Sequence, residues 1–155
     1  MQIYSFIAAI ALYILCAALP SRRGGLISAV TLVAWLLHGV GLWADIAGGG
    51  ELRFGFAAML SSALWVSVAA YWVENRNFSL DGMRRLVMPF AAGAAALQVA
   101  FPGNLVPLEG KSPLFGWHIA IATMAYSTLT IAAFHAVLMA LQEARLHART
   151  DSKSF

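Results

Sequence analysis

Long uncharged apolar stretches are the feature that most limits how this chain can fold. Five of them stand out, and each is about long enough to cross a hydrocarbon core of about 30 Å as a helix. The residues between them are rich in Gly, Pro, Asn and Arg, which is typical of helix ends and loops. We therefore expect an all-α fold, a polytopic transmembrane helix bundle of about five helices. The expected helices cover residues 3–19, 26–46, 55–73, 85–101 and 114–142.

The low charge content excludes an ordinary soluble domain. Only 11% of the 155 residues are charged and 61% are hydrophobic, whereas a soluble domain is about one quarter charged. Too few charged side chains are present to cover a core with a polar surface, so the apolar segments have to face lipid. The net charge of +3 comes from basic residues scattered between the apolar stretches. This scatter argues against nucleic-acid binding.

The sequence indicates one transmembrane bundle over residues 1–146, followed by a polar cytoplasmic tail over residues 147–155. The first apolar stretch has the length of a secretory signal, but no basic residue precedes it, and Arg22 and Arg23 follow it. We therefore expect it to be retained as a helix. Pro89 is expected near the start of the fourth helix, where a helix tolerates proline best.

Basic residues gather in alternate connecting segments. Eight of them fall on one predicted side of the membrane and two on the other. Because basic residues favour the cytoplasmic side, we expect the N-terminus outside and the C-terminus in the cytoplasm. The eight are Arg22, Arg23, Arg76, Arg84, Arg85, Arg145, Arg149 and Lys153, and the two are Arg53 and Lys111.

Histidines are the ionisable side chains that remain inside the predicted helices, because all seven acids lie in loops or at helix ends. The lack of an intramembrane carboxylate removes support for a proton-coupled carrier. His38 lies shortly before the end of the second helix, and His118 lies shortly after the start of the fifth. At about 1.5 Å of rise per residue, both imidazoles belong to the outer half of the membrane. His135 belongs to the inner half, and His147 lies in the tail.

Both outer-half histidines share a helix face with small residues. Small residues let helices approach closely, so we expect both faces to line the bundle interior. Two neutral imidazoles at similar depth on facing helices suit axial ligation of a haem iron, which makes His38 and His118 the candidate ligands. The face of His38 carries Thr31, Ala34, Gly41 and Asp45, and the face of His118 carries Ala122, Ala125, Leu129, Ala132 and Ala136.

The histidines also have a structural interpretation, and the motifs that are absent limit the chemistry the chain can perform. Each histidine can instead hydrogen-bond a neighbouring helix, and this structural interpretation is the one favoured for His135. His147, beside Arg145 and Arg149, is expected to be a solvated helix end. The lone Cys16 excludes a CxxCH site, so haem b would be held non-covalently. No phosphate-binding glycine loop, serine nucleophile motif or HExxH motif is present, and we expect no enzymatic activity.

Several segments, taken together, carry a resemblance to a known protein family. They are Ala34 to Leu42 (AWLLHGVGL), Phe54-Gly55-Phe56, Phe101-Pro102, and the run from Gly116-Trp117-His118-Ile119 through Ala125-Tyr126 to Leu141-Gln142-Glu143-Ala144-Arg145-Leu146. Over residues 3–148 the chain resembles the N-terminal portion of the cytochrome c assembly protein family (CcsA/CcmC-like), closest to its branch of YpjD- and HemX-type inner-membrane proteins. His38 and His118 match the histidine positions of that branch. The resemblance implies a protein that binds or passes haem during cytochrome c maturation, or that modulates haem supply.

The chain departs from the family in two respects. The tryptophan-rich external haem-handling motif is absent, with Trp43-Ala44-Asp45 as a fragment of it, and family members continue for several more helices. The histidine pair and the resemblance together make a haem chaperone in cytochrome c biogenesis the first expected function, with haem, other maturation proteins and the lipid bilayer as partners. Two alternatives stay open. One is a membrane adaptor that regulates haem synthesis or assembles with a partner subunit, and the other is a small haem b quinone oxidoreductase.

Overall fold

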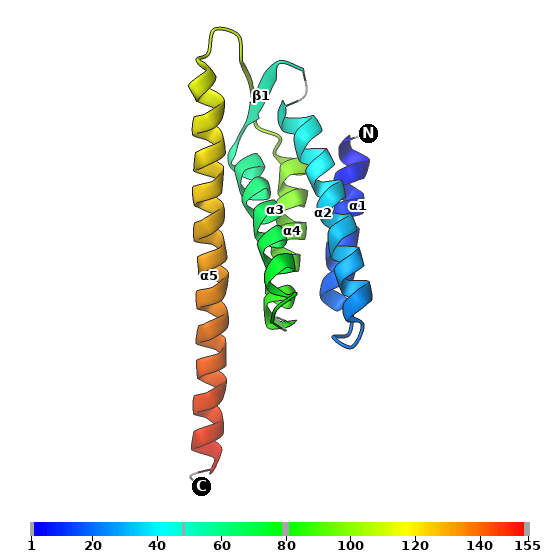
Figure 1. Ribbon diagram of the computed structural model, residues 1–155, viewed down its shortest axis with the longest axis vertical. Coiled ribbons are helices and arrows are strands. Elements are labelled where there is room, and N and C mark those ends of the chain that lie inside the picture. Colours follow the sequence, from blue (N-terminus) through cyan, green and yellow to red (C-terminus); the bar gives the residue numbers. More distant parts are fainter. Residues whose placement is uncertain (1, 48, 79–80, 154–155) are drawn as a thin grey trace.

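The computed structural model describes residues 2–47, 49–78 and 81–153 (Figure 1). Within these ranges the chain folds into five helices and one pair of short strands, which confirms the expected all-helical class. Three of the described helices, α2, α3 and α5, are long and apolar enough to cross a membrane, and α1 is a shorter apolar helix. The helices are α1 (Gln2–Ala18), α2 (Gly24–Ala47), α3 (Phe56–Glu74), α4 (Asp81–Ala100) and α5 (Pro113–Lys153).

The fourth helix begins earlier than the sequence predicted. It starts at Asp81 instead of residue 85, because the Asp81 carboxylate pairs with Arg84 and Arg85 one turn later and stabilises the first turn. Pro89 therefore lies inside the helix, and its expected place near the helix start is wrong. Lacking an N–H group, Pro89 cannot donate to the carbonyl of Arg85.

The fifth helix ends later than predicted. It continues past residue 142 to Lys153, so residues 147–153, expected as a polar tail, extend the helix into solvent. Residues 141–149 (LQEARLHAR) consist mostly of Ala, Leu, Glu, Gln and Arg, which are strong helix formers. Side chains also bond back to the preceding turn, as Thr150 Oγ1 does to the Leu146 carbonyl at 3.0 Å. Residues 154 and 155 of the predicted tail lie outside the described residues.

Successive helices run in alternating directions (Figure 1). Helix α1 packs against α2 and α4, while α3 packs against α2, α4 and α5. Helix α5 stands at one side of the bundle, is held mainly by α3, and extends beyond the others (Figure 1). The core lies where α1 to α4 meet, around buried Tyr13, Leu64, Met88 and Ala91. Because α5 contributes little to this core, much of its surface is left exposed.

Two short strands join the connections at one end of the bundle, called here the strand end. β1 (Glu51–Phe54) pairs antiparallel with β2 (Asn104–Pro107), with Glu51 opposite Pro107. Gly103 precedes β2 with a φ of 79°, and a Cβ atom there would collide with the Phe54 carbonyl. Glycine is therefore required at this crossing. The opposite end, where α1 and α3 end and α2 and α4 begin, is called the far end.

Candidate functional site

His38 is a fully buried core residue of α2. Its Nδ1 atom lies 2.9 Å from the Tyr13 hydroxyl of α1, and its Nε2 atom lies 2.7 Å from the Ser61 hydroxyl of α3. The ring also packs edge-on against Phe6 and Tyr13. Both ring nitrogens are engaged, so His38 joins three helices, and a metal ion would have to displace one of these partners.

The face of α2 that carries His38 lines the bundle interior, as predicted from its small residues. Thr31, Ala34 and Gly41 on this face are buried. The Thr31 hydroxyl lies 3.0 Å from Cys16 Sγ of α1 and donates to the Ile27 carbonyl at 2.7 Å. This polar contact beside His38 supports a structural role for the whole face.

His118 is exposed on α5. Among the described residues, no hydrogen bond to its ring is found. Its face, expected to line the bundle interior, is exposed at four of the five other positions, so that expectation is wrong. The exposed positions are Ala125, Leu129, Ala132 and Ala136.

The structure does not bring the two candidate ligands together. His38 is enclosed between α1, α2 and α3, whereas His118 is exposed on a helix held mainly by α3. One haem iron bound by both imidazoles does not fit this arrangement. Among the described residues, the exposed imidazole of His118 has no hydrogen-bond partner.

His135 joins α5 to α3, in agreement with its structural interpretation. Its Nε2 atom lies 3.2 Å from a carboxylate oxygen of Glu74, and its Nδ1 atom lies 2.9 Å from the Ile131 carbonyl. A carbonyl and an ionised carboxylate only accept hydrogen bonds. The Ile131 contact is therefore a hydrogen bond only with a proton on Nδ1. The Glu74 contact needs a second proton, either on Nε2 or on the Glu74 carboxyl group.

His147 lies on the exposed last part of α5, as expected for a solvated helix end. Its Nδ1 atom lies 3.0 Å from the Glu143 carbonyl. His38, His135 and His147 thus all have protein partners. Among the histidines, His118 is the one whose ring is both exposed and without a hydrogen bond in the described part of the chain.

An apolar groove of about 380 Å³ lies between α2, α3 and α5, in the strand-end half of the bundle. Its walls include Trp43 of α2, Trp65 of α3 and Met124 of α5. Gly39 allows close approach, since a Cβ there would lie 3.0 Å from the Trp65 indole nitrogen. Sites for small molecules usually have volumes of about 300–1,000 Å³, so the groove is large enough for part of an apolar ligand.

Paired tryptophans form the wall behind this groove. Trp35 and Trp65 stack with their ring centroids 4.6 Å apart. Each indole N–H donates to the backbone carbonyl of the other residue, at 3.0 and 2.9 Å. The sequence gave no signal of the groove, because the groove depends on how α5 docks against α2 and α3.

A polar cluster links α2, β1 and α4 at the strand end. Arg53 Nε lies 3.1 Å from Asp45 Oδ1, and Gln98 donates to Asp45 Oδ2 at 2.9 Å. Gln98 is buried, and its carbonyl oxygen has no hydrogen-bond partner among the described residues. Asp45 was predicted on the face of His38, but its two partners come from distant segments that spacing does not connect.

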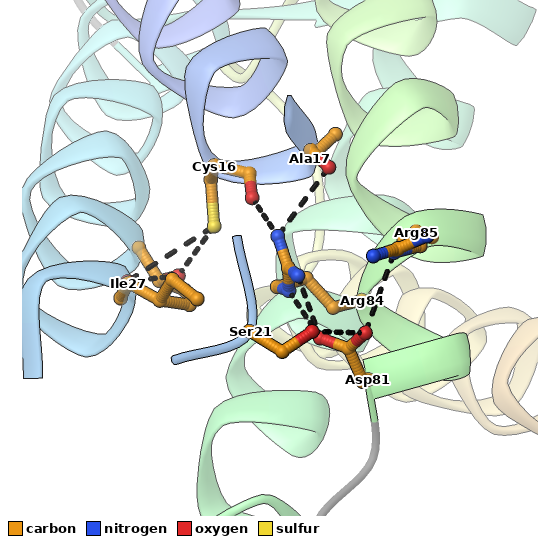
Figure 2. A network of polar contacts seen from close by, with 8 residues as sticks. Cys16, Ala17, Ser21, Ile27, Asp81, Arg84 and Arg85 are labelled. Carbon is orange, nitrogen blue, oxygen red and sulfur yellow. Dashed lines mark hydrogen bonds and ion pairs between the residues drawn. The ribbon is translucent and has the colours of Figure 1, made fainter. Parts of the chain in front are cut away.

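A second polar network, centred on Arg84, lies at the far end of the bundle (Figure 2). Arg84 is 1% exposed, and its guanidinium donates to the Asp81 carboxylate at 2.6 Å. It also donates to the carbonyls of Cys16 and Ala17 in the last turn of α1. Helix α1 has no basic residue in its own last turn, so Arg84 satisfies carbonyls that would otherwise lack partners.

Asp81 is the acceptor that this network shares. Ser21 donates to its carboxylate at 2.7 Å, and Arg85 lies 3.3 Å away. Partial burial opposes its ionisation, but the hydrogen bonds from Ser21 and Arg84 and the charges of Arg84 and Arg85 outweigh burial and hold the pKa of Asp81 below its usual value. Asp81 is therefore an ionised anchor between two arginines.

Comparisons with known protein families, curated proteins and solved structures find no match to this chain. Among the described residues, no group of three or more His, Cys, Asp or Glu side chains could hold a metal ion. The candidate sites are therefore the exposed imidazole of His118, the apolar groove and the arginine network. The first two lie in the strand-end half of the bundle, and the third lies at the far end.

Proposed function

We propose that the protein spans a bacterial cytoplasmic membrane five times, with its N-terminus outside and its C-terminus in the cytoplasm. The alternating helix directions support this topology (Figure 1). With these directions, Arg22, Arg76 and Arg84, the last in the first turn of α4, lie at the far end, and Arg53 of β1 lies at the strand end. Because basic residues favour the cytoplasmic side, the far end is the inner side and the strand end is the outer side.

In this orientation, the protein handles haem as a chaperone in cytochrome c biogenesis, with His118 as the iron ligand. The observation that carries this proposal is the exposed imidazole of His118, which is free of hydrogen bonds among the described residues and lies in the outer half of α5. Trp117, which is exposed beside it, provides an aromatic surface. Haem is a flat apolar macrocycle whose iron takes axial ligands. A single protein ligand suits transient binding, because release then requires only one bond to the protein to break.

Haem absorbance of the purified chain tests this proposal. Protein isolated from haem-replete cells should show a Soret band, and His118→Ala should weaken haem binding at least tenfold, since even losing a partner of a metal ligand costs about 10–100-fold. His147→Ala is the matched control, because His147 is also exposed on α5. A wild-type chain without a Soret band contradicts haem handling. An equal loss in both variants contradicts the assignment to His118.

A membrane adaptor that assembles with a partner subunit is the second candidate. Exposed alanines recur every fourth residue along α5, at positions 132, 136, 140 and 144. Small residues at this spacing let two helices pack closely within a membrane. This spacing favours a partner that contributes a membrane-embedded helix.

Site-specific crosslinking distinguishes the adaptor from an isolated chain. A cysteine introduced as Ala132→Cys should form an adduct with another polypeptide in native membranes, because it lies on the exposed alanine face. Ala11→Cys, on an exposed position of α1, should not, and Cys16 is buried. Identical crosslinking of both variants, or none at Ala132→Cys, would remove this candidate.

A further inference from the structure

We propose that a cavity at the far end of the bundle binds a phosphate group. The cavity has a volume of about 230 Å³ and lies between the start of α2, the end of α3 and the start of α4. It is at the opposite end from His118, so the proposal does not depend on haem handling. The residues that argue for an anion are Gly24, Tyr71, Arg76, Asp81 and Arg84, all of which line it.

The charges around the cavity favour an anion. Two guanidinium groups, of Arg76 and Arg84, line it together with one carboxylate, of Asp81. That carboxylate already pairs with Arg84 and, from outside the lining, with Arg85. A net positive charge therefore remains, and within the described ranges no ion pair between Arg76 and a carboxylate is found, so Arg76 carries the unpaired part of this charge.

Arg76 is placed at the edge of the cavity by an aromatic ring. Its guanidinium carbon lies 4.0 Å from the centroid of the Trp72 ring, and the Trp72 indole donates to the Ser28 hydroxyl at 3.0 Å. Stacking on an aromatic face restricts an arginine side chain while leaving its N–H edge available. The Arg76 donors are thus held near the cavity without being consumed.

Tyr71 adds a hydroxyl donor to the lining of the cavity. Its side chain is only 3% exposed, it lines the cavity, and no hydrogen bond from its hydroxyl is found among the described residues. The hydroxyl oxygen is not one of the fully buried unpartnered atoms of the described residues, so it remains accessible to a molecule in the cavity. An oxygen of a bound anion would accept this hydrogen bond.

The start of α2 adds backbone donors to the same cavity. The first turn of α2 contains no acidic side chain, and a Cβ at Gly24 or Gly25 would meet no atom within 4 Å. Gly24 lines the cavity, and the N-terminus of a helix attracts phosphate through its first backbone amides and its dipole. Guanidinium, phenol and amide donors together match the several acceptor oxygens of a phosphate.

The size of the cavity suits a phosphate group with a small substituent. Liquid water occupies about 30 Å³ per molecule, so a phosphate and some of its hydration shell fit within 230 Å³. The group can come from a phospholipid headgroup at the membrane surface or from soluble phosphate. Both sources present negatively charged phosphoryl oxygens, so the two have to be separated by experiment.

Protection against thermal unfolding in detergent measures binding from each source. One arm titrates the full chain with inorganic phosphate, and the other titrates it with short-chain phosphatidylglycerol. The uncharged diacylglycerol of the same chain length serves as the ligand control. Saturable protection by inorganic phosphate identifies the soluble source, and protection by phosphatidylglycerol alone identifies the headgroup. No saturable protection in either arm, or equal protection by diacylglycerol, overturns the proposal.

Matched variants tie the effect to the cavity. Arg76→Gln should weaken the apparent affinity about tenfold, and Tyr71→Phe should weaken it about three- to tenfold, as expected for a charged and a neutral hydrogen bond. Arg149→Gln and Tyr126→Phe remove the same groups from exposed positions of α5 and should bind as the wild type does. The proposal is wrong if the cavity variants, folded by circular dichroism, bind as tightly as these controls.

Discussion

Replacing Arg84 by methionine should lower the free energy of unfolding by about 3 kcal/mol, because it breaks the buried end of an ion pair and several hydrogen bonds at once. The Asp81 carboxylate loses its shortest partner. The carbonyls of Cys16 and Ala17 lose their donor in a place that water reaches poorly. Methionine fills a similar volume, so the loss reports the polar contacts and not a cavity.

Arg85→Met is the matched control for this prediction. Arg85 pairs with the same carboxylate at 3.3 Å, but its side chain is 62% exposed. Exposed ion pairs contribute about 0–1 kcal/mol, so this variant should cost less than about 1 kcal/mol. Denaturant unfolding of both variants in one detergent makes the comparison. Similar losses would mean that Arg84 is not the anchor of the far end.

The stability that Asp81 contributes should also depend on pH in a defined direction. Its pKa is lower in the folded protein than in a free side chain. The stabilisation is therefore complete above the unfolded pKa of about 3.9 and is lost as the pH falls through the lower folded value. Lowering the pH should therefore reduce the free energy of unfolding more in the wild type than in Arg84→Met.

The five helices were expected from the apolar stretches, and three of those described, α2, α3 and α5, are long and apolar enough to cross a membrane. A stretch without charge that is long enough to cross lipid has to satisfy its backbone internally, and a helix does so. The first three helices accordingly lie close to their expected ranges. β1 and β2 could not be foreseen, because four-residue strands are too short for a periodic pattern. Their pairing depends on the approach of Gly103 to Phe54.

The histidine faces show the limit of periodicity in a membrane protein. Helical spacing groups the neighbours of His38 and of His118 equally well, and only the first group is buried. Lipid is as apolar as leucine, so the pattern cannot tell a face that meets lipid from one that meets another helix. Helix α5 buries Ser127 and Phe134, which lie on a different face from His118.

The arginine network also lay beyond sequence reasoning. The distribution of basic residues predicted only that Arg84 belongs to the cytoplasmic side. The same prediction applies to the other seven basic residues of that side, so it does not single out Arg84. Its partners Cys16 and Ala17 belong to the end of α1, far away in the sequence. Only the packing of α1 against α4 reveals that one of these arginines is buried.

His38→Ala is expected to cost about 3 kcal/mol of stability while leaving haem binding at its wild-type level. The substitution opens a cavity among Phe6, Tyr13 and Ser61, and it removes a partner from each hydroxyl. Truncating a large buried side chain costs about 2–5 kcal/mol. Tyr13→Phe, in contrast, removes only one contact, and hydrogen bonds between membrane helices average about 0.6 kcal/mol. It should therefore cost about 1 kcal/mol or less.

Unfolding and Soret absorbance measured on the same samples separate the structural role of His38 from a ligand role. If His38 only holds α1, α2 and α3 together, stability falls in the order wild type, Tyr13→Phe, His38→Ala, and haem binding does not change. Loss of the Soret band in a folded His38→Ala protein would show that haem depends on His38, and His118 would then not be the ligand on its own. Equal stability of the two variants would mean that the buried imidazole contributes little beyond its bond to Tyr13.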